Sequence, residues 1–244
     1  EYKCTWFSVV PTIISSLINK FEPTELSQLN LKSLRFGRSA SAALAPETHK
    51  KFEEIFKIPL IETMGLTETC SPILSNPMPP HKPKYGSPGI SVGNEVKIFD
   101  EQFIEVPRNT IGQIVVRGLN VMKEYYKNSE ATKKSFSNDW LLTGDLGLMD
   151  EDGFVFVRGR IKELIIKGGE NISPREIDDV LYQHPLIVEA AAFGVFCNHY
   201  GEQVEAGVVI KDKAELKEED LINHCSKFLG EFKSPSKIHF LKEL

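Results

Sequence analysis

The sequence LKSLRFGRSASAALAPETHKKFEEIFKIPLIE, residues 31–62, indicates the fold class most clearly. We predict a strand over residues 31–37 and a short strand over residues 59–62. Between them, residues 46–57 are predicted to form a helix with Phe52 and Ile55 on one side. A strand–helix–strand order is typical of a parallel α/β layer.

On the N-terminal side, apolar residues recur at helical spacing over residues 10–21, which predicts an amphipathic helix. On the C-terminal side, six of the 14 prolines lie between residues 72 and 88, and we predict an ordered loop there because proline lacks a backbone donor. Short strands then follow, which predicts a β-rich part. They are expected at residues 96–99, 112–117 and 153–158.

The C-terminal third shows a different pattern. Ser173-Pro174-Arg175-Glu176 is a capping box that opens a helix. Further strands are predicted at residues 187–195, 204–210 and 237–241, with a helix over residues 216–229. Residues 161–244 carry 10 basic and 15 acidic side chains, whereas residues 1–160 carry 19 of each, so we place a domain boundary near residues 160–162.

These patterns predict an α/β fold in three parts. Residues 1–90 would be part of a parallel-sheet α/β subdomain, residues 91–160 a small β-rich subdomain, and residues 161–244 a small α+β C-terminal domain. The chain begins and ends in the middle of such patterns, so we expect a fragment of a larger protein. We also expect it to self-associate through the exposed edge of the incomplete sheet.

Composition excludes several classes of protein. With 41% apolar residues, 26% charged residues and a net charge of -5, the chain is neither disordered nor a nucleic-acid binder. No segment approaches the ~20 apolar residues of a membrane helix. The spacing of the cysteines does not suit zinc, so they predict free thiols and a cytoplasmic protein. They are Cys4, Cys70, Cys197 and Cys225.

Two polar clusters follow the strands of the α/β layer, where ligands gather in such sheets. In Met64–Thr69, a glycine lets the backbone approach a ligand, a threonine can bond phosphate and a carboxylate can hold Mg²⁺. A helix N-terminus explains Thr67–Thr69 equally well. The small side chains of Ser39–Leu44 suit packing against a purine, and a tight helix–sheet contact is the plainer alternative.

Two further clusters come later in the chain. Thr143–Gly147 follows apolar Trp140–Leu142, and its Asp145 can accept both hydroxyls of a ribose, although an Asp beside Gly usually marks a turn. In Gly159–Glu170, the guanidinium of Arg160 suits phosphate, and the paired glycines can approach a ligand closely. A solvated β-hairpin is the alternative for this segment.

Together, the four clusters and their order resemble the adenylate-forming superfamily: acyl-CoA synthetases, adenylation domains of peptide synthetases and firefly luciferase. The resemblance covers almost the whole chain. Further matching motifs are Val10-Pro11-Thr12, Gly112–Gly118, Glu124-Tyr125-Tyr126, Ala131-Thr132, His184-Pro185, Glu189-Ala190-Ala191 and Gly201-Glu202. The segments Gly159–Leu164 and Gly168–Pro174 look more like acyl-CoA synthetases than peptide-synthetase domains.

The resemblance implies roles for the matching residues. Thr67 would contact the phosphates of ATP, Glu68 the Mg²⁺ ion, and Asp145 the ribose hydroxyls. Lys162 falls at the hinge about which the C-terminal domain swings, and Gly168 and Gly169 belong to the loop that serves transfer to CoA. The residues implied to bind ATP or AMP are Ser41, Ala42, Ala43, Met64, Gly65, Thr67, Asp145 and Arg160.

Several positions depart from the family pattern. Met64 stands where an aromatic residue commonly lies against adenine, Glu124 replaces a frequent glycine, and Cys197 replaces a usual aspartate. The family's phosphate loop would precede residue 1, and its adenylating lysine would follow residue 244. We therefore expect this chain alone to be inactive in adenylation.

The implied activity is an AMP-forming acid–thiol ligation. ATP and a carboxylic acid would give an acyl-adenylate, from which the CoA thiol displaces AMP. Residues 5–12 resemble synthetases of small or dicarboxylic acids, and candidate pocket residues are Trp6, Phe7, Gly37 and Met64. The alternatives are an adenylation domain that loads a carrier protein and a non-enzymatic nucleotide-binding module.

Overall fold

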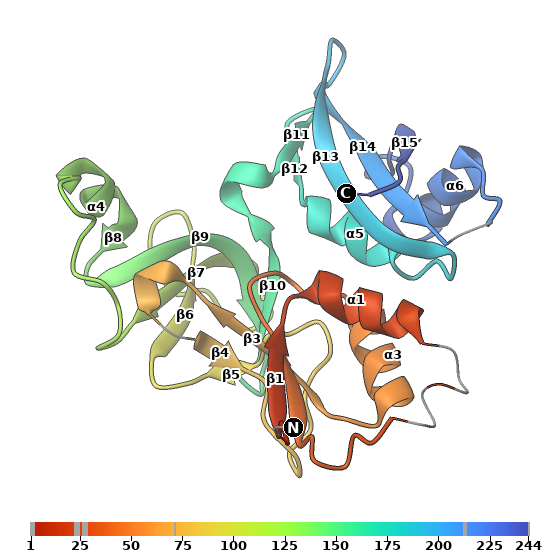
Figure 1. Ribbon diagram of the computed structural model, residues 1–244. Coiled ribbons are helices and arrows are strands. Elements are labelled where there is room, and N and C mark those ends of the chain that lie inside the picture. Colours follow the sequence, from red (N-terminus) through yellow and green to blue (C-terminus); the bar gives the residue numbers. More distant parts are fainter. Residues whose placement is uncertain (1–2, 22–24, 26–28, 71, 212–213, 244) are drawn as a thin grey trace. The chain divides into compact units, whose positions relative to one another are not determined.

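The computed structural model describes residues 3–21, 25, 29–70, 72–211 and 214–243. The chain divides into two compact units, residues 1–157 and 158–244 (Figure 1). The division falls within β10 (Val155–Arg160), a few residues before the boundary that the charge pattern predicts.

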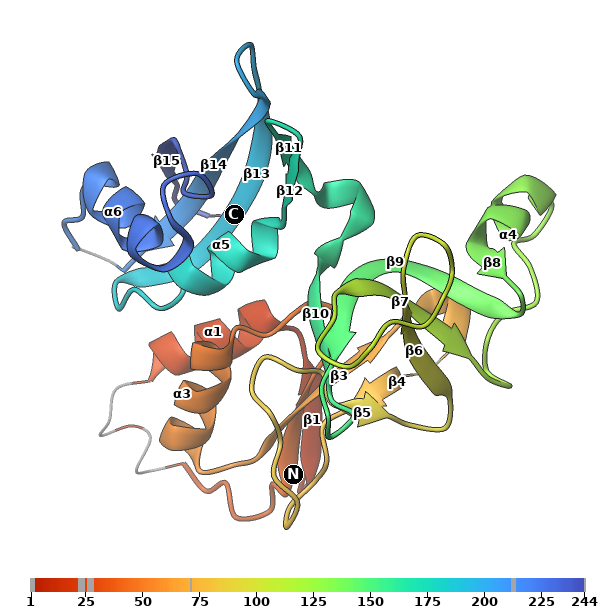
Figure 2. The ribbon, with the colours of Figure 1, turned by 180° about the vertical axis from the view of Figure 1, so that it is seen from behind.

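The first unit begins with the parallel layer. Strands β1 (Trp6–Val9), β2 (Phe36–Ser39) and β3 (Leu60–Gly65) pair in parallel, and both helices, α1 (Pro11–Lys20) and α3 (Pro46–Phe56), lie on the same face of this layer (Figures 1 and 2). The core between them is a cluster of apolar side chains. Its buried members are Ile14, Ile18, Leu44, Phe52, Ile58 and Leu60.

One strand of this layer begins later than the sequence predicts. The strand expected over residues 31–37 starts at Phe36, because the chain makes a turn in which the Leu34 N–H donates to the Leu31 carbonyl at 2.9 Å. Leu31 and Leu34 still pack against the core. Leu31 and Leu34 are therefore apolar because they pack against the core from a turn, and not because they belong to a strand.

The proline-rich segment is more regular than predicted. β4 (Pro72–Ser75) pairs antiparallel with β3 and with β5 (Ile90–Ser91), so the expectation of a loop over all of residues 72–88 was wrong at its start. Proline is tolerated as the first residue of a strand, and Pro72 occupies that position.

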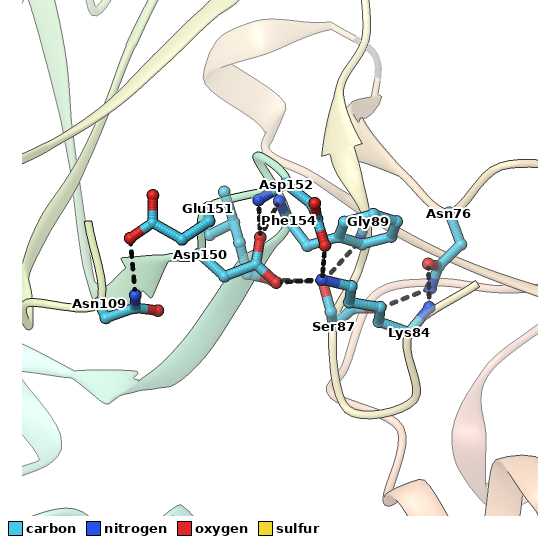
Figure 3. Close-up of polar contacts among 10 residues, drawn as sticks. Asn76, Lys84, Ser87, Gly89, Asn109, Asp150, Glu151, Asp152 and Phe154 are labelled. Atoms are coloured by element: carbon cyan, nitrogen blue, oxygen red, sulfur yellow. Dashed lines mark hydrogen bonds and ion pairs between the residues drawn. The ribbon is translucent and has the colours of Figure 1, made fainter. Parts of the chain in front are cut away.

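Polar contacts fix the rest of that segment against the turn after β9 (Figure 3). The Lys84 ammonium donates to Asp150 at 2.5 Å and to Asp152 at 2.6 Å. The Asn76 amide donates to the Ser87 carbonyl at 2.6 Å and accepts from the Lys84 N–H at 3.1 Å. Burial acts to raise the pKa of Asp150, but hydrogen bonds from Lys84 and from the backbone outweigh it and lower that pKa.

The second sheet of this unit is antiparallel, in the order β10-β9-β7-β6. Its strands include β6 (Glu95–Phe99), β7 (Gly112–Arg117) and β9 (Trp140–Met149), and the short strand β8 (Phe136–Ser137) after α4 (Ser129–Ser135) also pairs with β9. Trp140 is buried against Phe99, with the Arg117 guanidinium 4.5 Å from its ring centre.

Strand β9 is longer than the sequence predicts. The sequence favoured a turn where Asp145 follows Gly144, but the strand that begins at Trp140 continues to Met149. Its pairing with β7 shifts register between Gln113 and Val115, and Gly144 takes a φ of +77°. A β-bulge at a glycine therefore replaces the expected turn.

The second unit is a sheet in the order β12-β11-β14-β13, with β15 added in parallel to β14. Its strands are β11 (Ile165–Lys167), β12 (Glu170–Ile172), β13 (Ile187–Cys197), β14 (Gly201–Ile210) and β15 (Lys237–Phe240). Helices α5 (Pro174–Leu181) and α6 (Glu218–Leu229) lie on one face of it (Figure 2). The predicted capping box opens α5, with the Ser173 N–H donating to Glu176 at 3.3 Å. In the described part of the chain, no helix has the length and apolar character needed to cross a bilayer.

Candidate functional site

The first predicted cluster lies at the carboxyl end of β2. Ser41, Ala42 and Ala43 are exposed, and Ser41 takes a positive φ of +76°. The end of the loop is fixed in place, because Leu44 is buried and its N–H donates to a carboxylate oxygen of Glu62 at 3.2 Å. Glu62, only 2% exposed, joins the ends of β2 and β3, a role that the sequence analysis did not assign.

The second cluster lies at the carboxyl end of the neighbouring strand, β3. Met64 packs partly into the core, whereas Gly65 and Thr67 are exposed. The turn η1 (Thr67–Thr69) is closed locally by Thr69, whose hydroxyl accepts from the Leu66 N–H at 3.1 Å and donates to the Leu66 carbonyl at 3.0 Å. Local capping therefore uses Thr69 and leaves the side chains of Thr67 and Glu68 for other contacts.

Glu68 is held by the loop that follows β7. The Tyr125 hydroxyl donates to Glu68 Oε1 at 2.7 Å, and the Met122 N–H donates to the Glu68 carbonyl at 2.7 Å. The hydrogen bond to this carboxylate raises the pKa of Tyr125, which keeps the phenol protonated. Among the described residues, the other oxygen of Glu68 has no hydrogen-bond partner. A carboxylate oxygen of this kind is a ligand that Mg²⁺ accepts.

The described residues form no group of three or more His, Cys, Asp or Glu side chains that could hold a metal ion. A magnesium ion at Glu68 would therefore need further oxygen ligands from substrate phosphates and water, as is usual for Mg²⁺ with nucleotides.

Asp145 lies within β9, at the bulge made by Gly144. It is 4% exposed, and its N–H donates to the Thr143 hydroxyl at 3.0 Å, while that hydroxyl donates to the Ile114 carbonyl at 2.8 Å. The two bonds fix the backbone on either side of Gly144. Asp145 is therefore a buried strand residue, and the turn interpretation does not describe its local structure.

The remaining predicted residues belong to the second unit. Arg160 ends β10, and Lys162 lies in the exposed turn η2 (Ile161–Glu163). Gly168 and Gly169 join β11 (Ile165–Lys167) to β12 (Glu170–Ile172) with φ of +58° and +87°. Positive φ at both central residues is what a two-residue hairpin of type I′ requires, so the hairpin alternative describes the local structure.

A further polar pair beside this hairpin was not identified from the sequence. Lys167, 8% exposed, donates to the Phe232 carbonyl and lies 4.8 Å from the Phe232 ring centre. Burial lowers the pKa of Lys167. Backbone N–H groups of Tyr200 and His199, and then Lys167 itself, lower the pKa of the Cys197 thiol. Only the fold brings these residues together, since they are 30 or more positions from Lys167.

Comparison with known proteins identifies the family. Residues 1–126 match the model of the AMP-binding enzymes, and residues 176–244 match that of the AMP-binding enzyme C-terminal domain. The chain belongs to the AMP-binding enzyme family. The resemblance to the adenylate-forming superfamily is thereby confirmed, as is the mixed α/β fold class.

Two curated relatives match over the whole chain. Sulfoacetate–CoA ligase of Cupriavidus necator is 46% identical over 100% of this chain and 47% of its own length. Oxalate–CoA ligase of Saccharomyces cerevisiae is 40% identical over 100% of this chain and 44% of its own length. The chain thus spans about half the length of these AMP-binding enzymes.

Solved structures of the family share the fold. ATP-bound MatB from Rhodopseudomonas palustris matches with a TM-score of 0.89 at 34% identity, over 99% of this chain and 48% of that one. MenE from Bacillus subtilis in complex with the acyl-adenylate OSB-AMP matches with a TM-score of 0.83 at 31% identity, over 99% and 48%. The family therefore includes members solved with ATP and with an acyl-adenylate.

Proposed function

We propose that the full-length protein containing this chain is an AMP-forming acid–CoA ligase. The observation that carries the proposal is the identity of 46% and 40%, over the whole chain, to ligases that join an acid to CoA. Sulfoacetate and oxalate each have a second acidic group besides the carboxylate that is activated. We therefore extend the proposal to small acids, in line with the expectation from residues 5–12.

In the first half-reaction, the chain's own residues would position ATP. The small side chains of residues 41–43 leave room for the flat adenine, and Asp145 is a carboxylate suited to accept both ribose hydroxyls. Thr67 has an exposed hydroxyl for a phosphate oxygen. Glu68 would hold Mg²⁺ through the oxygen that Tyr125 leaves free, and the ion would neutralise charge on the phosphates.

In the second half-reaction, the CoA thiol would attack the acyl carbon and AMP would leave. We assign Lys162 as the hinge of this step and Gly168-Gly169 as the loop near the acyl group. The hairpin turn supports the second assignment, because two glycines without side chains let a ligand approach the backbone closely.

The test is to incubate the purified full-length protein with ATP, Mg²⁺, CoA and single acids, including sulfoacetate and oxalate. We expect AMP, pyrophosphate and one CoA thioester in equal amounts, measured by mass spectrometry. An acyl-adenylate that passes only to an added carrier protein would contradict the CoA assignment. If the protein binds nucleotide but releases no pyrophosphate with any acid, the result would support the alternative of a non-enzymatic nucleotide-binding module.

A further inference from the structure

Arg38 lies on the sheet face away from the helices. A side chain on its neighbour Gly37 would place Cβ 2.4 Å from the Phe7 ring, and Phe7 packs into the core with Ile14 and Phe52. Because successive side chains of a strand point to opposite faces, Arg38 points away from α1 and α3.

The guanidinium of Arg38 has few partners. Its Nε donates to the Thr63 hydroxyl at 3.0 Å, and Thr63 in turn donates to the Ser39 carbonyl at 3.3 Å. No carboxylate of the described residues forms an ion pair with Arg38. The side chain is partly buried, and its partner Thr63 is only 7% exposed. A partly buried guanidinium with four unused N–H donors is suited to bind an anion.

The position of Arg38 places that anion near the proposed nucleotide site. Arg38 precedes the loop at residues 41–43, and Thr63 precedes Met64 and Gly65, so their hydrogen bond joins two neighbouring parallel strands at their carboxyl ends. This is the edge of an α/β sheet where ligands bind.

We propose that Arg38 binds the second acidic group of the substrate, so that the enzyme selects small acids with two anionic groups. The inference rests on the proposed ligase function and names the residue that sets its substrate class. Arg38 would pair with a carboxylate or sulfonate while the other carboxylate is activated. Acids with an uncharged tail would leave the guanidinium without a counter-charge.

The test compares Arg38→Ala, Arg38→Lys and Arg35→Ala in the full-length protein, with oxalate, sulfoacetate, acetate and glycolate as acids. Arg35 is the matched control, because it lies three residues earlier, is exposed and carries the same charge. We expect Arg38→Ala to lower kcat/KM for oxalate and sulfoacetate about 10- to 100-fold, the loss of one or two charge-assisted hydrogen bonds. Activity with acetate and glycolate should not fall, and Arg38→Lys should keep part of the selectivity.

Three results would overturn the assignment. An equal loss of activity with all four acids would show that Arg38 only stabilises the local fold, through its hydrogen bond to Thr63. If the wild-type enzyme makes CoA thioesters only of singly charged acids, the proposed role of Arg38 is wrong, whereas the ligase function still holds. If no acid gives a thioester, the ligase function fails. Calorimetry of sulfoacetate and oxalate binding, with AMP present, then tests the role of Arg38 separately. Unchanged affinity for both acids in Arg38→Ala would show that Arg38 does not bind their second acidic group.

Discussion

The position of Asp145 depends on the positive φ of the preceding residue, Gly144. The bulge at Gly144 lets β9 continue past the motif and places the carboxylate in a strand interior, while Thr143 holds the backbone beside it. A turn in the same sequence would have left Asp145 in water, where two ribose hydroxyls would compete with solvent.

We predict that Asp145→Ala in the full-length protein weakens AMP binding at least about tenfold. The loss of two charge-assisted hydrogen bonds, each worth roughly 1.5–3 kcal/mol, exceeds the ~1.4 kcal/mol that corresponds to one decade. Isothermal titration calorimetry measures the effect. The control, Asp139→Asn, removes a negative charge at an exposed position just before β9 and should bind AMP normally. Unchanged AMP affinity in Asp145→Ala would show that this residue has only a structural role.

The sequence allowed the candidate residues to be named but not their partners. Glu68 was assigned from its motif, whereas its bond to Tyr125 joins residues 57 positions apart and depends on the loop after β7. Glu62 gave no signal, because an acidic residue at the end of an apolar strand is expected to reach solvent. Arg38 was not distinguished from any other charged strand residue until its face of the sheet was known.

Helix α5 contains a carboxylate in an unfavourable environment. Burial, followed by the nearby charge of Asp179, raises the pKa of Asp178 to about 7, against the opposing effects of a 2.6 Å hydrogen bond from the Ala192 N–H and of Arg175. In the unfolded chain an aspartate titrates near pH ~3.9. The folded form therefore holds a proton that the unfolded form has lost between about pH 4 and pH 7, and stability declines as pH rises through this window.

We predict that Asp178→Asn stabilises the second unit at pH 8, because the amide keeps the acceptor for Ala192 without the buried charge. A pKa difference of roughly three limits the gain to about 4 kcal/mol. Native-state hydrogen exchange of the amides of β13 (Ile187–Cys197) measures it. Most of the gain should disappear at pH 5, and Asp220→Asn in α6 should show none. A gain of equal size at both pH values would contradict burial of the charge.

Elements were predicted best where the sequence pattern is local. The helices over Pro11–Lys20 and Pro46–Phe56 agree with the predicted spans within about one residue, because proline and apolar periodicity mark them. Strands were predicted less well, since their ends depend on pairing. β9 continues through a glycine motif because β7 is beside it, and β4 begins at a proline because β3 and β5 offer partners.

The proposed hinge gives the clearest test of a two-step ligase. Lys162 is the middle residue of the 3₁₀ turn η2, a conformation with φ near -50 to -70°. Proline fixes φ at about -65°. Lys162→Pro therefore matches the φ typical of such a turn and would oppose a second backbone conformation with a different φ at this residue.

We predict that Lys162→Pro in the full-length enzyme retains acyl-adenylate formation and loses most thioester formation. Lys162→Ala, which leaves the backbone free, should be much milder. Rapid-quench assays of the two half-reactions, run separately, measure both variants. Equal loss of both steps in the proline variant would indicate misfolding, and full activity in both steps would exclude Lys162 as the hinge.

The two tryptophans have a practical consequence. Trp6 is half-exposed and stacks on Phe36 in the parallel layer, and Trp140 is buried in β9, so both belong to the first unit. Residues 158–244 contain no tryptophan. Intrinsic indole emission therefore reports on the first unit alone. A denaturation curve recorded by fluorescence would follow the surroundings of these two residues, and unfolding of the second unit needs a probe placed within residues 158–244.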